Sequence, residues 1–224
     1  QPAMLAICQA SGSAIAIANA INSASAQTGV TARANSLTLS STTTTVIGAT
    51  ATATLGINGT QIDITLEAGV SAQATRDNVV QRINQFTGLT GVTAADNGRG
   101  GLDLTAADGR NVSVYFDSDE AASAANFGLG GVTINGTNTA YTVVGVTDPA
   151  ALGASAVETA YSTVRLESAR TIDVRAGSLA FGAASNFTAL GFEENSYGTD
   201  QGGLRIAEVD VSTLEGAQAA LGAI

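Results

Sequence analysis

The chain has 224 residues, of which 45 % are apolar, and a formal net charge of −10. Such a chain can form a folded core, but its acidic surface disfavours nucleic acids and anionic membranes, and no apolar stretch reaches the roughly 20 residues of a membrane-spanning helix. Histidine and lysine are absent, which excludes Ser/His, Cys/His and lysine-based catalysis, so an enzyme would have to work with carboxylates, Tyr and Arg alone, as glycosidases do. Nothing in the composition points to such an enzyme, and we expect no enzyme, no metal site and no cofactor.

The first residues differ in character from those that follow. Gln1-Pro2-Ala3-Met4 resembles the cleavage-site end of a secretory leader, and Ser11-Gly12-Ser13 resembles a cloning linker. We therefore interpret residues 1–12 as a remnant of expression. The single cysteine, Cys8, lies in this segment and then says nothing about native redox chemistry.

A helix is expected over Ser13–Gln27, where small and branched apolar residues recur at helical spacing. Thr28-Gly29 ends it, and the alternation from Val30 to Leu39 predicts strand with a change of phase. A Ser/Thr run follows, expected as a polar strand or loop. Its hydroxyls are also candidate acceptors of O-linked sugars: Ser40, Ser41, Thr42, Thr43, Thr44 and Thr45.

A hairpin and a helix are expected next. Val46–Leu55 alternates and leads into Ile57-Asn58-Gly59, where Asn-Gly is typical of a type I′ turn. The return strand covers Ile62 to Leu66. A helix is then predicted over Thr75–Phe86, with an apolar face of Val79, Val80, Ile83 and Phe86, and Gly91-Val92-Thr93-Ala94 begins another strand.

The middle of the chain reads as short strands separated by turns. The expected elements are a turn at Asp96–Gly101, strands at Leu102–Leu104 and Val112–Phe116 on either side of the Asp108-Gly109 turn, a short acidic helix over Asp117–Phe127, an Asn135-Gly136 turn, strands through Val144, and a loop with a helical turn at 148–156. Strands are expected again at Val164–Leu166 and Ile172–Val174, and a Gly-rich loop at Gly191–Gly203. This order of elements predicts an α+β, mainly β fold.

The end of the chain has a helix-start signal. Ser212 and Glu215 form a capping box, in which the hydroxyl accepts a helix amide and the carboxylate reaches back. The apolar residues behind it step by three and four, as in a coiled coil. They are Leu214, Ala217, Leu221 and Ile224.

A helix–strand unit is repeated. Ile21-Asn22 is followed by Gly29-Val30-Thr31-Ala32, and Ile83-Asn84 is followed, 62 residues later, by Gly91-Val92-Thr93-Ala94. A weaker pair is formed by Asn126-Phe127 and Asn186-Phe187. We interpret these pairs as one supersecondary unit used twice.

These motifs resemble those of bacterial flagellins and hook-associated proteins. The complete unit looks like their hook IN motif, through Ile57, Asn58, Gly59, Ile83, Asn84, Gly91, Val92, Thr93 and Ala94, with a half copy at Ile21 to Ala32. Residues 206–224, with the cap at Ser212 and Glu215, resemble the start of the C-terminal core helix of flagellin. The resemblance covers about a third of the chain, and the middle rests on position alone.

The resemblance implies a structural role outside the cell. Residues 13–45 with 160–224 would form the filament-proximal part, and residues 46–159 the outer β-rich domain, in the manner of flagellin outer domains. The partners would be other flagellin subunits, bound through terminal coils that this chain lacks, so we expect the chain itself to be monomeric. The solvent-facing surface would serve as an antigen or carry glycans.

Two other functions stay open. Some flagellin-like proteins are surface receptors for polysaccharides such as alginate, although the net charge of −10 opposes an acidic glycan. A hook–filament junction protein would share the repeated unit, but the C-terminal match favours flagellin.

Several local patterns have simpler explanations than a functional site. Asp117, Asp119 and Glu120 lack the spacing of a calcium loop, and adjacent Glu193 and Glu194 would point to opposite faces of a strand. Formal N-glycosylation sequons begin at Asn58, Asn111, Asn135 and Asn186, and we expect none of them to be used.

Overall fold

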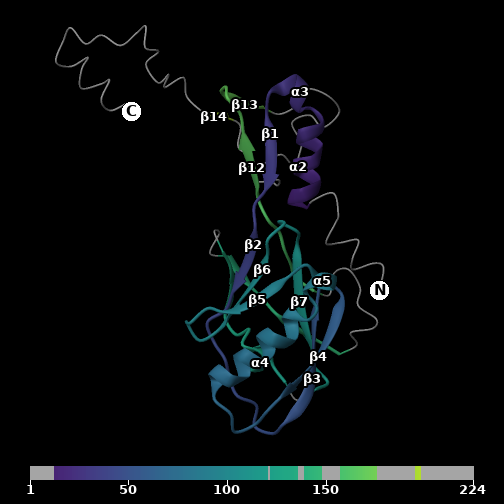
Figure 1. Cartoon of the computed structure of the whole chain (residues 1–224), viewed down its shortest axis with the longest axis vertical. Helices are drawn as coiled ribbons and strands as arrows, with labels where there is room; N and C mark the ends of the chain where they lie inside the picture. Colours follow the sequence, from purple (N-terminus) through teal and green to yellow (C-terminus); the bar gives the residue numbers. More distant parts are fainter. Residues whose placement is uncertain (1–12, 121, 136–138, 148–156, 176–194, 198–224) are drawn as a thin grey trace, which may run out of the picture. The chain divides into compact units, whose positions relative to one another are not determined.

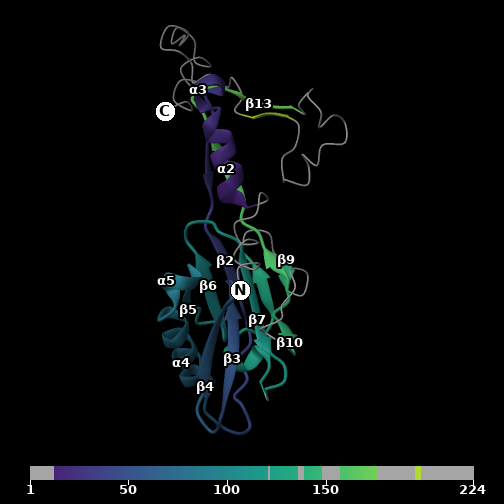
Figure 2. The same cartoon turned by 90° about the vertical axis from the view of Figure 1, so that its right-hand side faces the viewer.

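A computed structural model describes residues 13–120, 122–135, 139–147, 157–175 and 195–197. These residues form an α+β, mainly β protein, as the order of predicted elements indicated (Figures 1 and 2). Internal contacts divide the chain into two units, Gln1–Ser23 with Ala32–Leu166 and Ala24–Thr31 with Glu167–Ile224. Each unit is considered by itself.

The core of the first unit is built from two five-stranded sheets. One has the strand order β10-β7-β3-β4, with β11 also paired to β7, and the other has the order β5-β6-β2-β8-β9. The strands of the first sheet are β3 (Ala51–Ile57), β4 (Thr60–Leu66), β7 (Val112–Asp117), β10 (Val144–Val146) and β11 (Thr159–Ala160). The strands of the second are β2 (Leu37–Ser40), β5 (Thr93–Asp96), β6 (Leu102–Ala106), β8 (Val132–Ile134) and β9 (Thr139–Tyr141). All pairs are antiparallel except β10 with β7.

Both sheets contribute to one apolar core. Strand β4 alternates buried and exposed residues, so Ile62 and Ile64 point inward while the polar residues between them face outward. Leu39 of β2 and Leu104 of β6 join the same cluster from the other sheet. Tyr141 of β9 links the two sheets, because its hydroxyl accepts the Val114 amide at 2.8 Å and donates to the Glu158 carbonyl at 2.8 Å.

The helices of this unit are α2 (Ala14–Ser23), α4 (Ala72–Asn84), α5 (Thr87–Thr90) and the 3₁₀ helix η1 (Ala124–Phe127). Helix α4 lies beside β4 and β5 and also contacts η1 (Figures 1 and 2). It begins three residues before the predicted start, because the Ser71 hydroxyl accepts the Ala74 amide at 3.1 Å and caps the helix there. Val79 and Ile83 are fully buried, as the helical spacing indicated.

The predicted acidic helix over Asp117–Phe127 is wrong. Strand β7 continues to Asp117, and only Ala124–Phe127 is helical, as a single 3₁₀ turn. Ser123 and Asn126 fix this turn through a reciprocal capping box. Between β7 and η1 the Glu120 carboxylate accepts the Thr54 amide of β3, which holds this segment against the sheet.

Other boundaries also differ from the predictions. Strand β3 begins at Ala51, so the alternation at 46–50 does not form strand. The change of phase after Ala34 separates β1 (Thr31–Ala34) from β2, which lie in different sheets. Strand β2, predicted to belong to the filament-proximal part, is hydrogen-bonded between β6 and β8. The proposed division into filament-proximal and outer parts stays a prediction.

Short elements make up the rest of the described chain. Strand β1 pairs with β12 (Val164–Glu167), and β13 (Ile172–Val174) pairs antiparallel with β14 (Asn195–Tyr197). Strand β14 corrects the expected loop at 191–203 for these three residues. The single helix predicted over Ser13–Gln27 is interrupted at Ala24 and forms α2 and α3 (Ser25–Thr28), and α3 ends at Gly29, as predicted. The expectations for residues 1–12, 148–156, Gly136, Asn186-Phe187 and 206–224, with Ser212 and Glu215, lie outside the described residues.

Candidate functional site

The Asn-Gly turn of the complete unit is built as predicted. Ile57 pairs with Thr60 across a two-residue loop, and Asn58 and Gly59 have φ angles of 50° and 80°, both positive as a type I′ turn requires. Asn58 is buried, and its side chain donates to the Thr90 carbonyl at 2.9 Å and accepts the Ser113 amide at 2.9 Å. The hairpin tip is therefore fixed to α5 and to β7.

Asn84 joins the end of α4 to β5. Its side-chain nitrogen donates to the Ala94 carbonyl at 2.9 Å, and its side-chain oxygen accepts the Ala94 amide at 2.8 Å. One amide group thus satisfies both backbone groups of one residue, an arrangement that we call an asparagine clamp. The clamp joins the last residue of α4 to a strand residue ten positions further along the chain and so fixes the connection between them.

The half copy forms the same clamp. Asn22 donates to the Ala32 carbonyl at 2.9 Å and accepts the Ala32 amide at 2.7 Å. The hydrogen bonds that follow each clamp asparagine also repeat, because the Thr28 and Thr90 hydroxyls each donate four residues back at 3.1 Å and accept the amide two residues on at 3.2 Å. The sequence repeat is therefore a repeat of local structure.

A left-handed glycine ends the short helix in each copy. Gly29 has φ 71° and ψ 11°, and Gly91 has φ 70° and ψ 14°. Glycine adopts this conformation without the steric cost that a Cβ atom brings. In the complete copy, Gly91 also leaves room for the Arg110 guanidinium, which would lie 2.2 Å from an added Cβ.

The other residues of the complete unit divide between core and surface. Ile57, Ile83 and Val92 are fully buried, Ala94 is nearly so, and Thr93 is exposed. The motif residues therefore maintain the fold of the unit, since the described ones are turn, clamp or core positions with the exception of Thr93.

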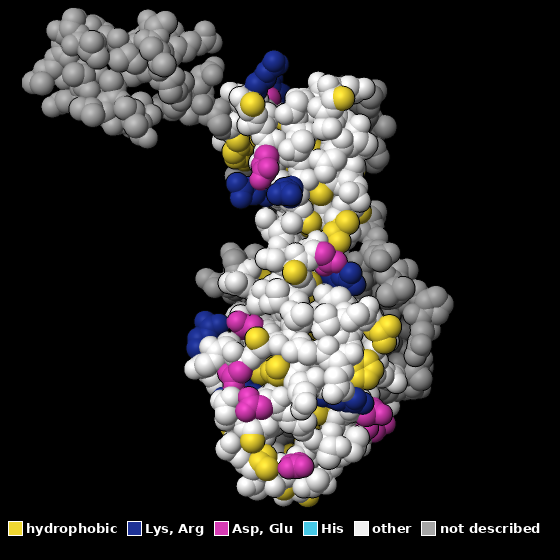
Figure 3. Space-filling model, viewed as in Figure 1, with side chains coloured by type: hydrophobic (Ala, Val, Ile, Leu, Met, Phe, Trp, Pro, Cys, Tyr) yellow, Lys and Arg dark blue, Asp and Glu magenta, His cyan; other side chains and the backbone are white. Residues whose placement is uncertain are grey.

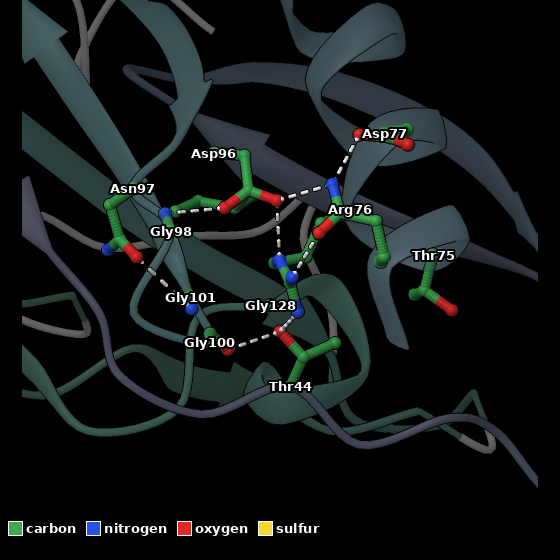
Figure 4. A network of polar contacts seen from close by, with 12 residues as sticks. Thr44, Thr75, Arg76, Asp77, Asp96, Asn97, Gly98, Gly100, Gly101 and Gly128 are labelled. Atoms are coloured by element: carbon green, nitrogen blue, oxygen red, sulfur yellow. Dashed lines mark hydrogen bonds and ion pairs between the residues drawn. The ribbon is translucent and has the colours of Figure 1, made fainter. Parts of the chain in front are cut away.

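A polar network joins the start of α4 to the second sheet (Figure 4). Arg76 donates from Nε to Asp96 at 2.8 Å, and Gln73 donates to the same carboxylate oxygen at 2.7 Å. The Arg76 hydrogen bond, with a further one from the Gly98 amide, holds the pKa of Asp96 below its ordinary value of 3.8. The pair is mostly buried and orients α4 against β5.

Sequence reasoning missed this network. Its signal was present, because Arg76 falls on the same helical face as Val79 and Ile83 and so places a charge toward the core. A charge at such a position requires a partner. The position of Arg76 in the sequence does not identify its partner, because Asp96 lies twenty residues further along the chain.

The Ser/Thr run lies between two glycine-rich turns. Ser41 is fully buried, and its hydroxyl donates to the carbonyls of Leu102 at 2.9 Å and Gly128 at 2.6 Å. The Thr44 hydroxyl donates to the Gly100 carbonyl at 2.7 Å. Ser41 is thus inaccessible to a glycosyltransferase, Ser40 and Thr44 are half-buried, and the exposed hydroxyl-bearing residues are Thr42, Thr43 and Thr45.

Two sequon asparagines are buried in the core. Asn58 is engaged as described above, and Asn111 is fully buried with neither side-chain polar atom hydrogen-bonded. Neither side chain can carry a glycan in this fold. Asn135 is exposed, but the rest of its sequon lies outside the described part of the chain. The whole sequon of Asn186 lies outside the described part.

The carboxylates considered for calcium serve the fold instead. Asp117 accepts the Asp119 amide at 2.9 Å, and Glu120 accepts the Thr54 hydroxyl at 3.2 Å. Outside that cluster, Asp103 of β6 accepts the Asn97 side chain at 3.2 Å. Within the described ranges, no three Asp, Glu, His or Cys side chains gather as a metal site would need.

The visible surface of the molecule is mostly neutral and polar. Figure 3 shows acidic, basic and apolar side chains scattered among uncharged ones. Of the helices in the described part of the chain, none has both the length and the apolar character to cross a bilayer.

No protein-family model matches the chain, and no curated protein is similar to it.

Proposed function

We propose that the chain is the solvent-facing part of a flagellar filament subunit, a structural protein rather than an enzyme. The observation that carries this proposal is the repeated asparagine clamp at Asn22 and Asn84. The residues that resemble the hook IN motif are those that build the clamp, the docked hairpin tip and the core of the unit. A motif that supports a fold rather than a pocket suits a displayed scaffold.

The position of the polar residues supports the same proposal. The outward-facing residues of β4 and β6 are Thr, Gln and Asp, and the cross-strand hydroxyls of Thr38 and Thr105 are 3.1 Å apart. Such faces interact well with water, and the side of the molecule drawn in Figure 3 carries no wide apolar area. A surface of this kind suits a domain that faces solvent along a filament.

Immunogold electron microscopy tests the proposal. An antiserum is raised against the folded chain and applied to cells of the bacterium that encodes it, and antiserum absorbed with the chain is the control. We expect gold along the whole length of the flagellar filaments. Gold only at the base of the filament would replace the proposal with a hook–filament junction protein, and gold on the cell body would favour a surface polysaccharide receptor. Absence of gold from cells that produce the protein would overturn it.

Glycan display is a separate part of the proposal. Its candidate acceptors are now Thr42, Thr43 and Thr45, with half-buried Ser40 and Thr44 behind them. The mass of the protein purified from its own bacterium, compared with that of the polypeptide, measures modification. Added mass that maps to this Ser/Thr run supports the display of sugars, and a mass equal to that of the polypeptide rules out glycan display. Calorimetry with alginate at low and high Ca²⁺ tests the polysaccharide alternative.

A further inference from the structure

The outer edge of β5 is occupied by a side chain instead of a strand. Strand β5 is the last strand of its sheet and pairs with β6 on one side only. In an antiparallel ladder, the N–H and C=O of one residue point to the same neighbour. For Ala94 that neighbour is the Asn84 side chain, which accepts the N–H and donates to the C=O. Asn84 therefore makes the two bonds that an added strand would make.

The half copy repeats this arrangement on β1. Asn35 donates its amide to the Thr163 carbonyl, so β12 lies on the side of β1 to which the odd-numbered residues point. Ala32 points to the opposite edge, where Asn22 binds both of its backbone groups. In the described residues this edge carries no second strand. Each clamp thus lies on an edge to which no further described strand is paired.

The same helix also covers the edge of the other sheet. Strand β4 pairs with β3 alone, and its outward carbonyls at Asp63 and Thr65 accept from Arg82 at 2.9 Å and Asn78 at 2.7 Å. Side chains of α4 therefore bind the edges of both sheets. Edge strands with free N–H and C=O groups are templates for pairing with another chain, and proteins protect them.

We propose that the clamps at Asn84 and Asn22 close latent strand-addition surfaces on β5 and β1, and that a second copy of this chain occupies such a surface when its clamp is lost. The second copy is the occupant because it brings the same open edge, and two identical edges can pair antiparallel about a two-fold axis. The short, alternating strand Thr93-Ala94-Ala95-Asp96 has small residues at its centre that allow close approach. This inference does not depend on the proposed function.

The test compares Asn84→Ala with Asn19→Ala, which changes an exposed asparagine of α2. Hydrogen exchange at the Ala94 amide reports the clamp itself, and light scattering after size exclusion, over a range of protein concentrations, reports association. At low concentration, where Asn84→Ala is monomeric, we expect exchange about tenfold faster, as loss of a hydrogen bond of typical strength implies. At high concentration the added strand should protect the Ala94 amide again. We also expect a concentration-dependent dimer or larger species, whereas Asn19→Ala stays like the parent chain.

A proline variant separates strand addition from general destabilisation. Asn84→Ala combined with Ala94→Pro removes the outward N–H that an added strand needs, and proline is tolerated at edges. We expect the double variant to return to monomer. Faster exchange without association, association of Asn19→Ala, or a double variant that still associates would each overturn the proposal. If Asn84→Ala does not fold, Asn84→Asp, which keeps the acceptor and loses the donor, is judged by the same criteria.

Discussion

The two copies of the helix–strand unit share local structure and differ in burial. Both have the asparagine clamp, the threonine hydrogen bonds and the left-handed glycine. In the complete copy, Ile83, Thr90 and Val92 are fully buried, whereas in the half copy Ile21 and Val30 are half-buried and Thr28 is exposed. The comparison teaches that short-range hydrogen bonds set the conformation of the unit, and that its surroundings set how much each residue contributes to stability.

The largest difference between the copies is expected for the isoleucine before the clamp. Ile83→Ala leaves a cavity in the core and should cost about 3–4 kcal/mol, within the range for buried aliphatic truncation. Ile21→Ala, in its half-buried position, should cost about 1 kcal/mol, since less apolar area leaves water there. Urea unfolding followed by circular dichroism measures the first, and hydrogen exchange of α2 the second. Equal costs would contradict the comparison.

The glycine pair should differ by less. Gly29→Ala forces a left-handed alanine and nothing else, because no atom lies within 4 Å of the added Cβ, so the cost should be about 1 kcal/mol. Gly91→Ala bears the same strain and also displaces the Arg110 guanidinium, which binds Asp108 at 2.7 Å, so we expect about 2–3 kcal/mol. Hydrogen exchange of the peptides around each glycine checks the difference. A larger effect at Gly29 would show that the neighbours of Gly91 rearrange freely.

The threonine pair isolates the effect of burial on one hydrogen bond. Thr90→Val leaves the Val92 amide without its acceptor in the core and should cost about 1–2 kcal/mol. Thr28→Val removes the matching hydrogen bond to the Val30 amide. Because water can replace this bond, the cost in stability should be only about 0.3 kcal/mol. The exchange rates of the two amides measure both. A strongly accelerated Val30 amide together with an unchanged Val92 amide would refute the assignment.

The smallest effect is a pH dependence confined to the complete copy. Asp96 has a pKa below 3.8 in the folded chain, so its contribution to stability is present above its ordinary pKa and is lost as the pH falls through the lowered one. The positions equivalent to Arg76 and Asp96 in the half copy are Ala14 and Ala34. Asp96→Asn should therefore flatten the acid dependence of stability below about pH 4. Thermal unfolding of the parent chain and of Asp96→Asn between pH 2 and 7 measures this dependence, with Asp77→Asn as the control.

Much of the local structure could be predicted from spacing. The Asn-Gly hairpin, the helix end at Gly29 and the inward face of Val79 and Ile83 depend on residues within one or two turns of one another. The short helix α5 before Gly91 was not predicted, and β5 begins at Thr93 and not at Gly91. The helix predicted after Asp117 failed because the Glu120 carboxylate binds Thr54, which lies on a strand far away in the sequence. The sequence likewise shows that Arg76 lies on the inward face of its helix, but it does not show that Asp96 is its partner.

The role of Ser41 shows the same limit for candidate sites. In the sequence it is one of six similar hydroxyls, yet it is the one enclosed by the turns at Leu102 and Gly128. Nothing in the run itself distinguishes it, because burial depends on which distant segments lie on either side. The tertiary structure thus reduces six candidate acceptors to three fully exposed ones.

The sequence by itself determined the mainly β character, the repeated unit and its turns, because these arise from backbone preferences and short-range hydrogen bonds. Only the tertiary structure decided that Asn22 and Asn84 lie on sheet edges without a further strand among the described residues, and that α4 covers an edge of each sheet of the core. The physical reason is that strand order brings together segments far apart in the chain. An asparagine near a helix end looks the same in the sequence whether it faces water or takes the place of a missing strand.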